Sequence, residues 1–172
     1  MNVAPKPFDY RRLELYRLHV SYACPWCHRC LIARALCGLS ALRVTHVEPV
    51  MDEQGWRVPG CGQMSDVYRR FGFGRAGRAT VPLLVDEGDG TAISNDSGEI
   101  MRLLGQAGGA CSATGPDLIP LAFAAQIDET NAFVQTGVNE KVYRVGFADG
   151  VDEKCQAERE LAAQARARAR AS

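Results

Sequence analysis

Two cysteines separated by two residues carry the sharpest chemical signal in the chain, in the stretch Cys24-Pro25-Trp26-Cys27. The stretch follows a segment with strand character and precedes one with helical spacing, so Cys24 is expected at a helix N-terminus. There the helix dipole and the unpaired backbone N–H groups stabilise a thiolate, the nucleophilic form of cysteine. We therefore predict that Cys24 is a catalytic nucleophile. Cys27 is a second catalytic candidate that could resolve a mixed disulfide; for each cysteine the alternative is a buried thiol without a redox role.

The same cysteines do not predict a metal site. Zinc would need a second pair of ligands at a matching spacing. The other candidates, Cys30, Cys37, Cys61 and His46, are not spaced in that way. We expect no metal.

Three further stretches could hold a small ligand. Pro82 enters a predicted strand, where proline is confined to an end or an edge, and a cis bond before it would free the backbone of Val81 to pair with a peptide-like substrate. Asp96 and Ser97 open a predicted helix, where they could hold the charged groups of a zwitterion or simply cap the helix. Trp56 lies in a turn-rich segment and either contacts a ligand or packs on the core.

The order of the predicted elements shows how these residues could meet. We predict strands over residues 14–21, 42–50, 80–86 and 91–94, and helices over residues 27–39, 64–71 and 96–104, with a turn-rich segment at 52–63 and a glycine loop at 72–77. Only helical spacing follows, over residues 118–142 and 152–171. This order predicts an α/β thioredoxin-like N-terminal domain over residues 13–105, a linker over 106–117 and a partial all-α domain over 118–172.

Composition limits the function classes. The 172 residues include 20 Lys and Arg against 20 Asp and Glu, which argues against nucleic acid as the main partner. No apolar run reaches the roughly 18 residues of a membrane span, and the N-terminus lacks the apolar block of a secretory signal. Four of the seven cysteines lie within residues 24–37, which favours free thiols in a reducing compartment. We expect a cytoplasmic protein that does not enter a membrane.

These stretches together resemble a known family. Residues 23–29 are similar to the active-site motif of the omega-like and xi-class glutathione transferases. Residues 49–56, 80–86 and 94–100 resemble the segments that surround glutathione in the xi class, and residues 127–148 resemble the opening of its helical domain. Over roughly residues 15–150 the chain resembles the glutathionyl-hydroquinone reductases.

The resemblance implies a thiol-dependent reductase that removes glutathione from glutathionyl-hydroquinones. Its cysteine would attack the sulfur of the conjugate, and a second glutathione would resolve the mixed disulfide. Glutathione is then the co-substrate, small quinol conjugates are the other ligands, and a homodimer is expected. The substrate-binding residues that the resemblance implies are Trp56, Arg70, Val81, Pro82, Asp96, Ser97 and Tyr143, the last as a contact to the quinol.

The chain departs from this family in two ways. The family usually has alanine where this chain has Cys27, so a glutaredoxin-like dithiol oxidoreductase is an alternative function. The stretch after about residue 160 is rich in Ala and Arg and does not resemble the family. The helical domain is therefore expected to be C-terminally truncated, and a non-catalytic fragment is a further alternative.

Overall fold

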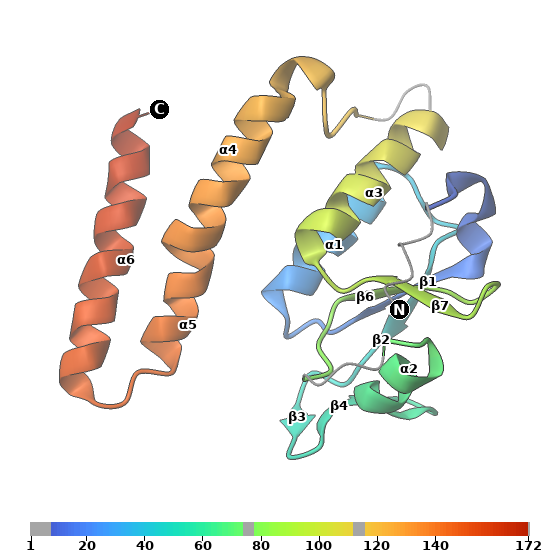
Figure 1. Cartoon of the computed structure of the whole chain (residues 1–172), viewed down its shortest axis with the longest axis horizontal. Coiled ribbons are helices and arrows are strands. Elements are labelled where there is room, and N and C mark those ends of the chain that lie inside the picture. The colour runs from blue at the N-terminus through green and yellow to red at the C-terminus, as the bar shows by residue number, and fades with distance from the viewer. Residues whose placement is uncertain (1–7, 74–77, 112–115, 172) are drawn as a thin grey trace. The chain divides into compact units, whose positions relative to one another are not determined.

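A computed structural model describes residues 8–73, 78–111 and 116–171, and the chain divides into two compact units, Met1–Ile119 and Pro120–Ser172. The first unit contains a four-stranded mixed sheet in the order β2-β1-β6-β7 (Figure 1). Strand β1 (Tyr16–Val20) is parallel to β2 (Arg43–His46) and antiparallel to β6 (Leu83–Asp86). Strand β7 (Thr91–Ser94) completes the sheet beside β6. The predicted α/β thioredoxin-like class is confirmed.

Two helices pack against each other next to this sheet, α1 (Pro25–Leu36) and α3 (Ser97–Cys111) (Figure 1). The strands and helices share one core, whose fully buried side chains include Leu18, Val20, Leu83, Leu84, Val85, Ile100 and Leu104. Each buried Leu, Ile or Val contributes about 1.5–3 kcal/mol of transfer free energy. This core fixes the ends of β1 and β6, where the cysteine motif and Pro82 lie.

The strand and helix that flank the cysteine motif differ slightly from the prediction. A 3-10 helix, η1 (Tyr10–Leu15), precedes β1, and its first turn is capped by Asp9, whose Oδ1 accepts a 3.1 Å hydrogen bond from the backbone N–H of Arg11. Helix α1 begins at Pro25 rather than at Cys27, because the fixed φ of proline suits the first helical position. Gly38 ends the helix with φ +64°, as its position predicted.

Helix α3 continues to Cys111, so its predicted end at residue 104 is wrong, and residues 106–111 are helical rather than linker. The glycines that suggested a break allow close helix packing instead. A Cβ on Gly108 would lie 2.5 Å from the Sγ of Cys37, just after α1, so only glycine fits there. Residues 112–115, the centre of the predicted linker, lie outside the described residues.

The turn-rich segment at 52–63 contains a small antiparallel sheet that the sequence did not predict. Its strands are β3 (Met51–Asp52), β4 (Gly55–Val58) and β5 (Gly62–Gln63). Strands this short lack an alternating pattern, and Gly55 turns the chain between the first two with φ +111°. Helix α2 (Met64–Arg70) follows, close to the predicted bounds. The predicted strand over 42–50 is confined to β2.

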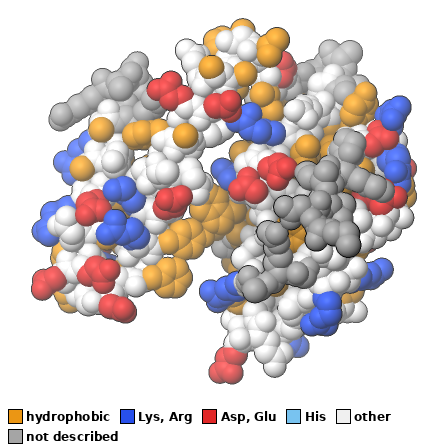
Figure 2. Space-filling model, viewed as in Figure 1, with side chains coloured by type: hydrophobic (Ala, Val, Ile, Leu, Met, Phe, Trp, Pro, Cys, Tyr) orange, Lys and Arg blue, Asp and Glu red, His pale blue; other side chains and the backbone are white. Residues whose placement is uncertain are grey.

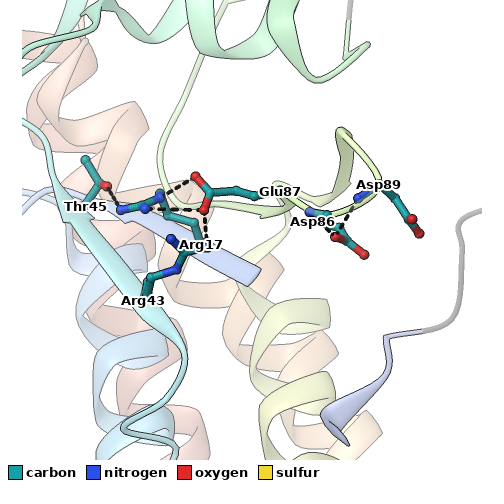
Figure 3. Close-up of polar contacts among 7 residues, drawn as sticks. Arg17, Arg43, Thr45, Asp86, Glu87 and Asp89 are labelled. Atoms are coloured by element: carbon teal, nitrogen blue, oxygen red, sulfur yellow. Dashed lines mark hydrogen bonds and ion pairs between the residues drawn. The ribbon is translucent and has the colours of Figure 1, made fainter. Parts of the chain in front are cut away.

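Polar side chains link neighbouring strands of the four-stranded sheet (Figure 3). Arg17 on β1 donates from Nε to Oε1 of Glu87 at 2.6 Å and from Nη1 to Oγ1 of Thr45 at 3.0 Å, and Arg43 forms an ion pair with the same carboxylate. Burial raises the pKa of Glu87, but the hydrogen bonds from Arg17 and the charge of Arg43 outweigh it and hold that pKa below its usual value. The cluster joins β1, β2 and the turn after β6.

The second unit is helical. Its elements are η2 (Leu121–Phe123), α4 (Ala124–Val134), a π-helical turn η3 (Gln135–Asn139), α5 (Glu140–Gly146) and α6 (Val151–Ala171). The predicted single helix over 118–142 is therefore interrupted, and the break before α6 is confined to residues 147–150. On α6, Glu160 pairs with Arg144 at 3.0 Å and with Lys141 at 3.6 Å.

Charged side chains of both signs are interspersed on the visible face of this helical unit (Figure 2). Among the described residues, no helix combines the length and the apolar character needed to cross a bilayer.

Candidate active site

Cys24 lies at the N-cap of α1, in the bend between β1 and the helix. Its carbonyl oxygen accepts hydrogen bonds of 3.1 Å from the N–H groups of Cys27 and His28, which starts the helix. The side chain is 8% exposed, and its Sγ lies 3.5 Å from the carbonyl oxygen of Val81. The structure therefore brings the predicted nucleophile to the strand edge that carries Pro82.

The surroundings of Cys24 favour its thiolate. The hydrogen bond from the Cys27 side chain lowers the pKa of Cys24 to about 6, against the opposing effect of burial. The backbone N–H groups of Cys27 and Trp26 contribute to the same lowering. A lowered pKa of this kind is typical of reactive cysteines, because the thiolate is the nucleophilic form.

Cys27 has the opposite character. It is fully buried, and its Sγ accepts a 3.4 Å hydrogen bond from the backbone N–H of Ser21. The hydrogen bond to the Cys24 sulfur and burial both raise the pKa of Cys27 well above its usual value. Cys27 is therefore a protonated thiol that donates to its neighbour.

The peptide bond between Val81 and Pro82 is cis. Tyr68 on α2 holds the segment that leads into it: the hydroxyl donates to the carbonyl oxygen of Thr80 at 3.0 Å and accepts from the side-chain amide of Asn95 at 3.2 Å. Tyr68 thus links α2, the approach to Pro82 and the approach to α3. Sequence reasoning missed this role, because an aromatic residue in a short helix gives no local sign of its partners.

Asp96 and Ser97 lie at the start of α3, as predicted. Oδ1 of Asp96 accepts a 2.7 Å hydrogen bond from the N–H of Glu99, so this carboxylate caps the helix and is also exposed. Ser97 is buried, and its Oγ accepts a 3.0 Å hydrogen bond from Nε of Arg29. Arg29 was not among the predicted site residues, although it lies only two positions after Cys27.

Arg29 also covers the indole of Trp26, with its Cζ 5.0 Å from the ring centroid. This cation–π contact and the bond to Ser97 fix the guanidinium between the cysteine motif and the N-terminus of α3. Together they place a positive charge next to the N-terminus of α3, an arrangement suited to a ligand carboxylate.

The remaining predicted residues lie on other elements. Trp56 is half-buried on β4 of the small sheet, where it packs against the core. Arg70 is exposed at the end of α2, with its Cζ 5.4 Å from the centroid of the Phe71 ring. Tyr143 is 43% exposed on α5, in the second compact unit, and its ring is stacked on Phe147 at 6.1 Å between centroids. No three His, Cys, Asp or Glu side chains of the described residues group together as metal ligands.

A comparison with protein families identifies the part of the chain that carries this geometry. Residues 23–107 match the family described as glutathione S-transferase, N-terminal domain. These residues belong to that family. The match covers the cysteine motif, Val81-Pro82 and the start of α3, so the site lies within the glutathione S-transferase N-terminal domain.

The relatives of this domain support the resemblance expected from the sequence. The chain is 39% identical over 148 residues to the glutathionyl-hydroquinone reductase YqjG of Escherichia coli and 37% identical over 145 residues to the glutathionyl-hydroquinone reductase PcpF of Sphingobium chlorophenolicum. These matches cover 78% and 77% of this chain but only 45% and 46% of the relatives. The chain therefore spans about half the length of the curated relatives it matches.

Solved structures agree with the fold of the glutathione S-transferase domain. The xi-class glutathione S-transferase of Phanerochaete chrysosporium matches 85% of this chain and 55% of its own, with a TM-score of 0.76 and 36% identity. The glutathione-bound structure of YqjG from Escherichia coli matches 85% of this chain and 52% of its own, with the same TM-score and identity. The predicted likeness to the xi class is confirmed.

Proposed function

We propose that this chain is a glutathione-dependent reductase that removes glutathione from glutathionyl-hydroquinones, with Cys24 as its nucleophile. The observation that carries the proposal is the position of the Cys24 sulfur: it lies at a helix N-terminus with a pKa of about 6, and 3.5 Å from the carbonyl oxygen of Val81. The names of the relatives YqjG and PcpF support the substrate class.

Glutathione would bind across the residues that surround Cys24. The similar structure of YqjG is a glutathione-bound one, which supports this co-substrate for a chain of the same fold. The backbone of Val81 would pair with the peptide part of glutathione, and the glutathione sulfur would then lie next to Cys24. The start of α3, with Ser97 and the charge of Arg29 behind it, would take a carboxylate of the ligand.

The chemistry is a nucleophilic displacement at sulfur. The Cys24 thiolate attacks the sulfur of the conjugate, an S–S bond forms, and the bond between that sulfur and the quinol ring breaks. The ring carbon takes up a proton, so hydroquinone leaves. A second glutathione then attacks the mixed disulfide, which yields glutathione disulfide and regenerates the Cys24 thiolate. Tyr143 is proposed as the contact to the quinol ring, as an aromatic wall with a polar end.

We also propose that the protein works in the reducing environment of the cytoplasm. Six cysteines of the described residues are free thiols: Cys24, Cys27, Cys30, Cys37, Cys61 and Cys155. Free thiols suit the cytoplasm, where thiols stay reduced. Free Cys24 is the form that the reaction requires.

The test compares Cys24→Ser with Cys61→Ser, which removes an exposed cysteine from the β4–β5 turn. Release of hydroquinone from a synthetic glutathionyl-hydroquinone is followed by liquid chromatography in the presence of glutathione. We expect Cys24→Ser to lose at least about a hundredfold in rate, and Cys61→Ser to match the parent. Turnover by Cys24→Ser at the parent rate would remove the proposal.

A further inference from the structure

We propose that Cys27 is a second catalytic residue, which attacks the Cys24 mixed disulfide and closes an internal Cys24–Cys27 disulfide. The inference rests on the proposed function, because it needs a glutathionyl group on Cys24. It extends that function, since the glutathione would be released by the protein itself before any second glutathione reacts. The relatives YqjG and PcpF are named for their reaction with glutathionyl-hydroquinones, and those names specify no such step.

The Cys24 and Cys27 side chains are already neighbours in the structure. Cys24 is the N-cap of α1 and Cys27 lies one turn along the same helix, with a hydrogen bond between their side chains. Cys27 is fully buried, whereas Cys24 is 8% exposed. A glutathione molecule therefore reaches Cys24 and not Cys27, and the disulfide sulfur that Cys27 can attack is that of Cys24.

The electrostatics of Cys27 change when Cys24 becomes a disulfide. In the free enzyme the leading cause of the raised pKa of Cys27 is its hydrogen bond to the Cys24 sulfur, followed by burial. A Cys24 sulfur that is bonded to glutathione carries no negative charge, so that cause is removed. The N–H of Ser21, 3.4 Å from the Cys27 sulfur, remains and stabilises the thiolate that forms there. The first reaction thus activates the second thiol.

The step balances without a further reagent. Cys27 loses its proton, its sulfur forms a bond to the Cys24 sulfur, and the bond between Cys24 and the glutathionyl sulfur breaks. The departing glutathione takes up a proton and leaves as the thiol. Two further glutathione molecules then reduce the internal disulfide to the dithiol and become glutathione disulfide.

The third cysteine of the helix does not compete for this role. Cys30 is also fully buried, and its Sγ donates to the carbonyl oxygens of Trp26 at 3.4 Å and Ser97 at 3.6 Å. Burial raises the pKa of Cys30 to about 12. Cys30 is therefore a structural thiol and provides a matched control for substitutions of Cys27.

The test uses the full chain, reduced and freed of small thiols, and a small excess of glutathione disulfide in the absence of oxygen. After an acid quench, intact mass and peptide mapping identify the product; mapping is needed because Cys61 and Cys155 are also exposed. We expect the parent and Cys30→Ser to contain a Cys24–Cys27 disulfide and no glutathione on Cys24. Cys27→Ala, which keeps a small apolar side chain, should retain one glutathionyl group on Cys24.

Two results would overturn the inference, and they differ in what they say of the proposed function. A parent protein that retains glutathione on Cys24 as stably as Cys27→Ala would exclude a resolving role for Cys27 and leave Cys24 as a nucleophile. A parent protein in which Cys24 is neither glutathionylated nor oxidised would remove both proposals. If a variant fails to fold, the state of Cys24 in the parent protein, internal disulfide or glutathione adduct, still tests the inference.

Discussion

Arg29 on α1 donates a 3.0 Å hydrogen bond from Nε to Oγ of Ser97, the first residue of α3. The two residues are 68 positions apart in the chain. The bond joins the helix that begins at Cys24 to the helix start that is proposed to take a ligand carboxylate. Because the guanidinium also lies over Trp26, a single side chain connects the cysteine motif to the start of α3.

Replacing Arg29 by Met should therefore weaken glutathione binding more than it slows the chemistry. Loss of a hydrogen bond to a charged group costs about 1.5–3 kcal/mol, or roughly a ten- to hundredfold rise in KM for glutathione, while kcat stays within about twofold. Steady-state kinetics measures both, and Arg29→Lys should restore part of the loss. Arg34→Met is the control, since Arg34 lies on the same helix but donates to the carbonyl oxygens of Ser40 and Leu42. Equal effects of the two substitutions would contradict the positioning role.

Alkylation of Cys24 should follow a titration with a midpoint near pH 6, because the Cys27 side chain holds the pKa of Cys24 at about 6. The rate of reaction with iodoacetamide, measured for the Cys24 peptide by mass spectrometry, reports the thiolate directly. In Cys27→Ala the midpoint should rise toward the ordinary value of about 8.5, since the leading cause of the shift is lost. Cys30→Ser should keep the parent midpoint. An ordinary cysteine titration in the parent would show that the thiolate is not stabilised.

Local patterns were enough to predict the parts of the site that depend on local structure. The strand, the tight bend and the helix around Cys24 follow from residues 14–39, and the strand entry at Pro82 and the start of α3 follow from similar short signals. The contacts of Arg29 with Ser97 and of Tyr68 with Thr80 and Asn95 join distant segments, and no local pattern specifies them.

The errors in the predicted fold have the same origin. Gly108 looks like a helix breaker in the sequence, yet it lies inside α3 because Cys37 packs against it. Helix propensity favours an end there, and tertiary packing overrides it. The π-helical turn at Gln135–Asn139 likewise interrupts a segment whose spacing predicted one continuous helix.

Removing the Tyr68 hydroxyl should destabilise the first unit. Tyr68→Phe leaves the carbonyl oxygen of Thr80 and the amide of Asn95 without this partner, which costs about 1–3 kcal/mol in the free energy of unfolding. Denaturant unfolding measures the loss. Tyr22→Phe is the control because Tyr22 is 75% exposed and should change stability by less than about 0.5 kcal/mol. A Tyr68→Phe protein as stable as the control would show that the hydroxyl is not needed to hold the approach to Pro82.

His19 should make the protein sensitive to acid. It is 5% exposed on β1, and neither ring nitrogen has a hydrogen-bond partner among the described residues. Burial first, and the charge of Arg17 second, lower the pKa of His19 from 6.5 to about 4. The unfolded chain therefore binds a proton before the folded one, and folding stability falls as the pH drops from 6.5 toward 4, by roughly 3 kcal/mol in all.

The check for His19 is a series of denaturant unfolding curves between pH 7 and pH 4. His19→Leu should lose this part of the pH dependence, and at pH 7 it should be at least as stable as the parent, since two unpaired buried nitrogens are removed. His28→Leu, which changes an exposed histidine on α1, should keep the parent slope. Parallel profiles for the parent and His19→Leu would show that His19 is not held neutral.

The contact between α3 and the end of α1 can be tested at two adjacent glycines. A Cβ on Gly108 would lie 2.5 Å from both Cβ and Sγ of Cys37, whereas a Cβ on Gly109 would have no atom of the described residues within 4 Å. Gly108→Ala should therefore destabilise the protein by about 1–3 kcal/mol through overpacking. Gly109→Ala should stabilise it by up to about 1 kcal/mol, because alanine favours the helix. Thermal unfolding of both variants gives the comparison. Opposite shifts in Tm would establish that close packing, and not helix propensity, requires glycine at residue 108; a shift of the same sign in both would refute it.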